Sequence, residues 1–222
     1  MPAPIGAVRV RRLARAKRLT LRVRHATGEV ELTAPPRVRR RELERFVAGQ
    51  AGWIAARRAA LPAQILPAAG DSIDVLGAPL LLASGPKLHR AGDRLDLPGE
   101  GARYRAALAG FLNETARGAL AEASDRYAAM IGVAYTRLSL RDTRARWGSC
   151  SSAGRLMFSW RLVLAPRDVL EYVAAHEVAH LREMNHGLGF WALVEEMRPS
   201  FREERSWLRR NGAGLHRYRF DV

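Results

Sequence analysis

The sequence predicts an α+β protein with a mainly β N-terminal subdomain containing a helix, over residues 1–100, and an α+β domain over residues 101–222. Three observations lead to this fold class. Apolar side chains recur at every second position near the N-terminus, as in half-buried strands. An alanine-rich stretch in the middle has apolar residues at helical spacing. Three of the six histidines lie within residues 176–186, in a pattern typical of a helix.

The first hundred residues contain two sets of expected strands separated by a helix. Residues 8–34 alternate and turn at Thr27-Gly28, which predicts a hairpin with one solvent-facing side. Residues 39–61 have helical spacing with arginines on the opposite face. Short strands are expected over 72–97, and the Pro- and Gly-containing segment 98–101 then predicts a linker between the two parts.

The second part is expected to begin with helix and to contain the motif on a later helix. Residues 102–131 form one long helix or two, closed by Gly132. The helix that carries the histidines is expected over 166–184, with Pro166 in its first turn. The other expected elements are a strand over 135–141, a loop over 146–152, a strand or helical entry over 155–164, and helices over 190–197 and 200–210.

Cysteine content and hydropathy indicate a cytoplasmic protein that does not use a membrane. Cys150 is the single cysteine, so no internal disulfide can form, which fits a reducing compartment. No run of about 18 apolar residues predicts a membrane span, and the N-terminus shows no apolar signal core. The first 28 residues are arginine-rich, as transit peptides are, but the alternating strand pattern explains the same residues.

Positive charge is concentrated near the N-terminus. The formal net charge is +15, and residues 1–62 hold 15 basic and 4 acidic side chains, whereas residues 63–135 hold 7 and 8. Such a segment could contact nucleic acid, nucleotides or an acidic partner. The alternative is a solvated surface that keeps the protein soluble.

The strongest functional signal is the motif His176-Glu177-Val178-Ala179-His180. Residues four apart share a helix face, so His176 and His180 can bind one metal ion. Glu177 is positioned to take a proton from a water that the metal activates. The pattern therefore predicts a metal-dependent hydrolase with one Zn²⁺ per chain, and replacing the Glu177 carboxylate should abolish turnover while leaving metal binding intact.

The third ligand follows from spacing. His186 stands where His-Glu-x-x-His-x-x-Gly-x-x-His proteases have their third histidine, although Glu183 replaces the usual glycine. We therefore expect the chain to turn later, around residues 185–187. The rival ligand is a carboxylate on the following helix, Glu195 or Glu196, as in sites with two histidines and a glutamate.

Other candidate residues carry weaker signals. Arg146 could bind a substrate carboxylate or phosphate, or it could be a solvated arginine. Cys150 could ligate the metal, but a lone buried cysteine is commoner. The isolated His25, His89 and His216 are expected at surface or structural positions.

Three segments together resemble the YgjP-like family, small bacterial metallopeptidase-like proteins related to the SprT and WLM zinc proteases. The resemblance rests on these segments: Arg146-Trp147-Gly148-Ser149-Cys150-Ser151, Tyr172-Val173-Ala174-Ala175-His176-Glu177-Val178-Ala179-His180, and Asn185-His186 followed by Phe190-Trp191. It implies a zincin-like catalytic domain with zinc at His176, His180 and His186, and Glu177 as general base. It also implies that the strand near the Trp-Gly-Ser-Cys segment borders the cleft.

Three functions remain open at this point. The leading hypothesis is a zinc metallopeptidase whose peptide or protein substrate pairs with a strand edge. The second is a metal-dependent nucleoside triphosphate pyrophosphatase, an activity also attached to a member of the family, although the sequence has no Gly-x-x-x-x-Gly-Lys loop. The third is a protease that contacts nucleic acid through its basic N-terminal segment.

Overall fold

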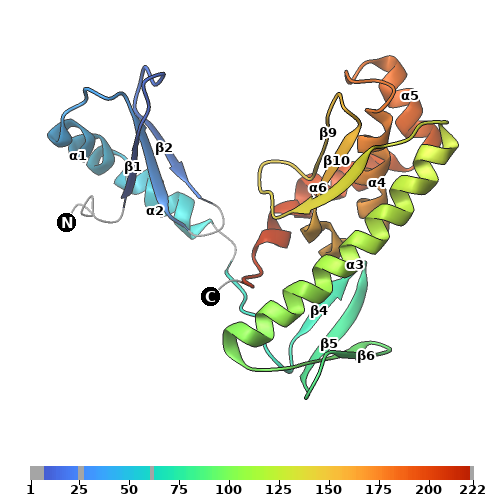
Figure 1. The fold of residues 1–222 in the computed structure, drawn as a ribbon. Helices are drawn as coiled ribbons and strands as arrows, with labels where there is room; N and C mark the ends of the chain where they lie inside the picture. Colours follow the sequence, from blue (N-terminus) through green and yellow to red (C-terminus); the bar gives the residue numbers. More distant parts are fainter. Residues whose placement is uncertain (1–7, 25–27, 61–62, 221–222) are drawn as a thin grey trace. The chain divides into compact units, whose positions relative to one another are not determined.

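A computed structural model describes residues 8–24, 28–60 and 63–220, and it is a mixed α+β structure, as expected from the sequence. The chain forms two compact units, residues 1–64 and 65–222 (Figure 1). We expected a division after residue 100, and the structure instead divides after Gln64. The reason is packing: Leu82 and Leu97, from the strands before residue 100, share one apolar core with Leu108 of the helix that follows.

The first unit is a three-stranded sheet with two helices (Figure 1). β2 and β3 form the expected antiparallel hairpin, although residues 25–27 of its turn lie outside the described residues. β1 pairs with β3 in parallel, so β3 is central and β2 is an edge strand. The expected helix 39–61 is interrupted at Gln50. The elements are β1 (Val8–Arg12), β2 (Thr20–Val23), β3 (Val30–Ala34), α1 (Arg40–Gly49) and α2 (Ala51–Ala59).

Period-two alternation explains the small core of this unit. Leu32 and Ala34 of β3 are buried together with Leu43 and Val47 of α1. Glu31, which precedes Leu32, points to the other face, where Arg11 and Arg24 bind it at 2.9 and 2.7 Å. These two ion pairs join the central strand to β1 and to the residue that follows β2.

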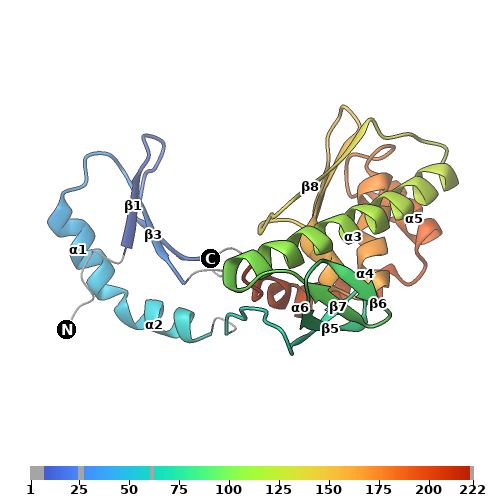
Figure 2. The same cartoon turned by 60° about the horizontal axis from the view of Figure 1, so that its bottom comes forward.

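The second unit begins with a four-stranded sheet against a long helix (Figure 2). Tyr104 of the helix donates a hydrogen bond to the carbonyl oxygen of Ala83 in the sheet, at 3.4 Å. The alanine-rich stretch is a single helix of 30 residues, one of the two alternatives expected. The elements are β4 (Ser72–Val75), β5 (Ala78–Ser84), β6 (His89–Ala91), β7 (Arg94–Leu97) and α3 (Gly101–Met130), with strand order β4-β5-β7-β6.

A second sheet of this unit contains a strand that we expected to be loop. β9 (Gly148–Cys150) lies within 146–152 and pairs antiparallel with β10 (Arg155–Ser159), which pairs in parallel with β8 (Arg137–Arg141). The chain reverses between β9 and β10 at Gly154, whose φ is +68°. A 3₁₀ helix, η2 (Trp160–Leu164), follows β10.

The motif helix α4 (Arg167–Ala179) lies against α3, α6 and β9. Its middle is buried almost completely, because small residues such as Ala174 and Ala175 let neighbouring elements approach closely. The remaining elements are α5 (Leu188–Met197), α6 (Phe201–Asn211) and the 3₁₀ helix η3 (Gly212–His216). Within the described part of the chain, no helix combines the length and apolar character needed to cross a bilayer.

Candidate metal centre

The three motif histidines lie together at the end of α4. Each of His176, His180 and His186 offers a ring nitrogen, and these three nitrogens lie within 4.8 Å of one another. Nε2 of His186 is 3.1 Å from Nε2 of His176. Three imidazoles that converge in this way can hold one metal ion, and three histidine ligands are typical of a catalytic zinc site.

The protonation of these rings fits metal binding. Burial, followed by the neighbouring histidines, lowers the pKa of His176 to about 3, and burial also lowers the pKa of His180. Both rings are therefore neutral at pH 7, as a metal ligand must be. Nδ1 of His180 lies 3.0 Å from the carbonyl oxygen of Glu183, which only accepts hydrogen bonds, so the proton belongs on Nδ1 and Nε2 keeps its lone pair.

The turn that brings His186 into the cluster differs from the expected one. Helix α4 ends at Ala179 rather than near residue 184, and Leu181, Arg182 and Glu183 continue it with turn hydrogen bonds. No residue between 180 and 187 has a positive φ, so the turn does not use left-handed geometry at residues 185–187. This conformation needs no glycine at position 183.

The rival carboxylates are not part of the cluster. Glu195 lies on α5 and pairs with Arg202 at 2.6 Å, and neither Glu195 nor Glu196 joins the three histidines. His89 is exposed on β6, His216 packs against Trp147 in η3, and His25 lies outside the described residues.

Aromatic side chains of α5 pack against the three histidine rings. Phe190 is fully buried, and its ring centroid lies 4.5 Å from that of His180, 4.7 Å from His186 and 4.9 Å from His176. Trp191 stacks on His186 at 5.8 Å and on Phe201 at 5.4 Å. These contacts restrict the rotation of the rings and keep their nitrogens directed toward one point.

Glu177 is the buried acid of the site. Its side chain is on α4 beside the histidines, and the residue is only 5% exposed. Burial raises the pKa of Glu177 to about 8, against the opposing effects of Arg146 and of a hydrogen bond from the Cys150 backbone N–H. A carboxyl group with a pKa near the working pH is well matched to general acid–base chemistry.

Gly148 is a site residue that sequence reasoning did not identify. A Cβ atom on Gly148 would lie 2.5 Å from Oε1 and 2.6 Å from Cγ of Glu177. Glycine is therefore needed for β9 to approach the carboxylate so closely. The glycine of the Arg-Trp-Gly-Ser-Cys segment was the available signal, but its partner Glu177 is 29 positions away and only the fold brings them together.

A cleft of about 470 Å³ lies over the histidines, bordered by β9 and the turn after α4. Arg146, Ser149 and Met184 line it together with the three histidines and Glu177. An adjoining hollow of about 230 Å³ shares Arg146, Gly148, His176 and Glu177 with the cleft, and its other walls are mostly apolar: Trp147, Tyr172, Val173 and Leu208. Arg146 is exposed at the junction of both spaces, where a substrate carboxylate could reach it.

Cys150 contributes its backbone rather than its thiol. It is half-buried on β9, and it is not part of the group of metal-ligating atoms. Burial, followed by the charge of Glu177, raises the pKa of the thiol to about 11, so the thiol stays protonated at neutral pH. A protonated thiol is a poor metal ligand.

Arg161 fixes the segment that leads into β9. Its guanidinium is 3% exposed and binds both carboxylate oxygens of Asp142, at 2.6 and 2.9 Å. It also donates to the carbonyl oxygens of Leu215 and Tyr218 near the C-terminus. One buried cation thus joins the C-terminal segment to the chain just before Arg146 and Gly148.

Comparison with known proteins gives two findings. A family model described as "YgjP-like, metallopeptidase domain" matches residues 17–211. Among solved structures, the crystal structure of the metallopeptidase zymogen of Pyrococcus abyssi abylysin is similar, with 17% sequence identity, a TM-score of 0.38, and coverage of 41% of this chain and 93% of that one. No curated protein matches the chain.

Proposed function

Because the chain belongs to the YgjP-like metallopeptidase family, we propose that it is a zinc-dependent peptidase in which His176, His180 and His186 hold the metal and Glu177 is the general base. The observation that carries this proposal is the group of three imidazoles whose nitrogens lie within 4.8 Å of one another, beside one buried carboxyl group in an open cleft. When bound, zinc supplies Lewis acidity, which lowers the pKa of water and polarises a carbonyl oxygen.

The protein side chains supply the proton transfer. In its ionised form, the Glu177 carboxylate accepts a proton from the attacking water and then passes it to the amine that leaves. The backbone N–H of Cys150 donates a hydrogen bond that holds this carboxylate in place. The absence of a side chain on Gly148 leaves room for the carboxylate beside β9. Fixed placement matters because an error of about 1 Å can cost a hundredfold in rate.

The cleft also has features that suit a peptide. β9 is an edge strand of its sheet and borders the cleft, so an extended substrate can lie alongside it. The adjoining hollow, with Trp147, Val173 and Leu208 in its wall, suits an apolar substrate side chain. Arg146 is placed to bind a substrate carboxylate.

The test combines metal analysis with hydrolysis of an unfolded, fluorescently quenched protein. The wild type should contain about one zinc per chain and cleave the substrate, and Glu177→Gln should keep the zinc and lose turnover. His186→Ala should lose most of the zinc, whereas the matched control Glu195→Gln should keep both zinc and activity. A wild-type protein without metal-dependent cleavage, or an active Glu177→Gln variant, would contradict the proposal.

A second candidate is hydrolysis of nucleotide phosphates. A hollow of about 450 Å³ on the β8-β10-β9 sheet is lined by Arg137, Arg141 and Arg155, and it shares Ser149 with the cleft. Arginine binds phosphate oxygens well. Release of pyrophosphate from nucleoside triphosphates by the same preparation, lost in Glu177→Gln and weakened in Arg155→Gln, together with no cleavage of protein, would reverse the order of the two candidates.

A further inference from the structure

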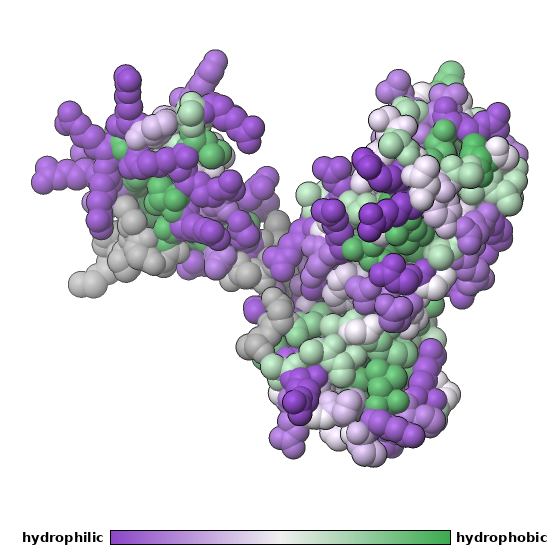
Figure 3. All heavy atoms as spheres, in the orientation of Figure 1, coloured by the Kyte–Doolittle hydropathy of each residue, from purple (hydrophilic) through white to green (hydrophobic). Residues whose placement is uncertain are grey.

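The first unit holds most of the net charge of the chain, and its own acids cannot neutralise it. Residues 1–64 contain 15 basic and 4 acidic side chains. Glu31 is shared between Arg11 and Arg24, and Glu44 pairs with Arg40. Figure 3 shows hydrophilic side chains extending around a small apolar area on the visible face of this unit. Such an excess of arginine attracts a polyanion.

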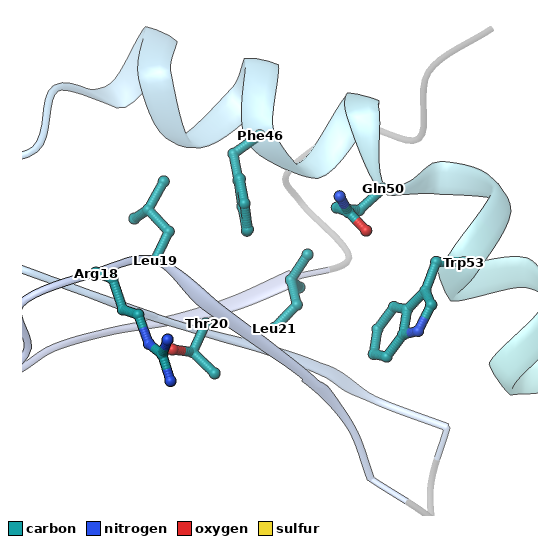
Figure 4. A pocket seen from close by; sticks show the side chains of 7 residues that line it. All are labelled: Arg18, Leu19, Thr20, Leu21, Phe46, Gln50 and Trp53. Atoms are coloured by element: carbon teal, nitrogen blue, oxygen red, sulfur yellow. The ribbon is translucent and has the colours of Figure 1, made fainter.

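A groove lies between β2 and the two helices of this unit. Its volume is about 260 Å³, and Leu21, Phe46 and Trp53 supply its apolar walls. In Figure 4, Phe46 and Trp53 extend from the helices toward β2, while Arg18 lies on the opposite side of the groove near the strand. Trp53 is 43% exposed, so much of its indole ring is accessible to a ligand. None of the lining residues is acidic.

We propose that this groove binds single-stranded nucleic acid. One base stacks on Trp53, and a neighbouring phosphate is held by Arg18, which lines the groove just before β2. Base stacking on an exposed aromatic ring together with arginine contacts to the backbone is the usual basis of binding to single strands. The proposal does not depend on the hydrolytic site, because every residue in it belongs to the first unit.

The shape of the groove favours a single strand over a duplex. In a duplex both faces of each base are covered by neighbouring bases, so an indole in a groove has no free base face to contact. A peptide could pair with the open edge of β2, but a groove without an acidic residue in a strongly cationic unit favours an anionic chain. An acidic peptide is therefore the alternative that the experiment must separate.

The test measures binding of a fluorescent 12-nucleotide oligothymidylate to the full-length protein by anisotropy over a range of salt concentrations. We expect log Kd to rise linearly with log salt, because cations are released from the strand. Trp53→Leu should weaken binding roughly tenfold, and Trp53→Phe, which keeps an aromatic ring, should recover most of the loss. Arg18→Gln should weaken binding and reduce the salt slope by roughly 0.7.

Matched controls make the result specific to the groove. Lys87→Gln removes one exposed positive charge from the second unit and should leave the affinity within about twofold, since that side chain is distant in the sequence from the groove. Circular dichroism checks that each variant is folded. The proposal is overturned if no binding occurs at 50 mM salt, if a duplex or a polyglutamate peptide binds as tightly as the oligonucleotide, or if folded Trp53→Leu binds like wild type.

Discussion

The two units of this chain use arginine in opposite ways. In the second unit Arg161 and Arg198 are largely buried, and each makes several charged hydrogen bonds: Arg161 to Asp142, and Arg198 to Asp168, Glu171 and Glu204. In the first unit the arginines outnumber the acids so strongly that most of their charge faces solvent. Arginine therefore fixes the geometry around the candidate active site in one unit, and in the other it is available for an external anion.

The largest expected effect of a single arginine change is in the second unit. Arg161→Leu leaves Asp142 and two carbonyl oxygens without their shared donor, so we expect the free energy of unfolding to fall by about 3 kcal/mol. Hydrolysis should also decrease, because the chain leading into β9 loses its anchor. Urea denaturation followed by circular dichroism measures the first effect, and substrate cleavage measures the second.

The matched change in the first unit is Arg45→Leu, at an exposed position on α1. Surface substitutions of this kind usually change stability by less than about 0.5 kcal/mol. Similar losses for Arg45→Leu and Arg161→Leu would show that burial does not distinguish the two sets of arginines.

The next effect tests the approach of β9 to α4. Gly148→Ala places a methyl group on the Glu177 carboxylate, so the carboxylate must move, and we expect kcat/KM to fall roughly a hundredfold. The metal content should stay the same, because Gly148 does not belong to the group of metal-ligating atoms. Steady-state kinetics and zinc analysis on the same sample separate the two outcomes.

The control for this change is Gly118→Ala, at an exposed position in α3 where a new Cβ meets no atom within 4 Å. It should leave kcat/KM unchanged and stabilise the helix by roughly 0.5–1 kcal/mol. Full activity in Gly148→Ala would mean that the carboxylate tolerates displacement and that its fixed position is not important for the reaction.

Local patterns in the sequence predicted the elements and contacts that form between residues close together in the chain. The spacing of His176, His180 and His186 predicted a cluster, and the structure brings these side chains together. Alternation predicted the β2–β3 hairpin, and helical spacing predicted α3.

The features that sequence reasoning missed depend on partners far apart in the chain. β9 has the polar sequence Gly-Ser-Cys, and it is a strand only because β10 pairs with it. The closeness of Gly148 to Glu177 and the parallel pairing of β1 with β3 have the same origin. The division after Gln64 also follows from tertiary packing, since no change in composition at that point separates strands that join the second core from strands that do not.

The smallest expected effect concerns Glu31, which is bonded by two arginines of the first unit. The hydrogen bonds from Arg24 and Arg11 hold the pKa of Glu31 below its usual value of 4.5. An acid whose pKa is lower in the folded state stabilises the fold above its unfolded pKa, and this contribution is lost as the pH falls through the folded pKa. Glu31→Gln should therefore lower the melting temperature of the first unit by a few degrees at pH 7, and the difference from wild type should shrink below pH 4.5 and disappear once Glu31 is protonated.

Hydrogen exchange in β2 and β3 localises the change, and Glu42→Gln, on the exposed face of α1, is the control that should show no such pH-dependent difference. A deficit in Glu31→Gln that stays constant down to pH 2.5 would show that the ion pairs around Glu31 do not cause it.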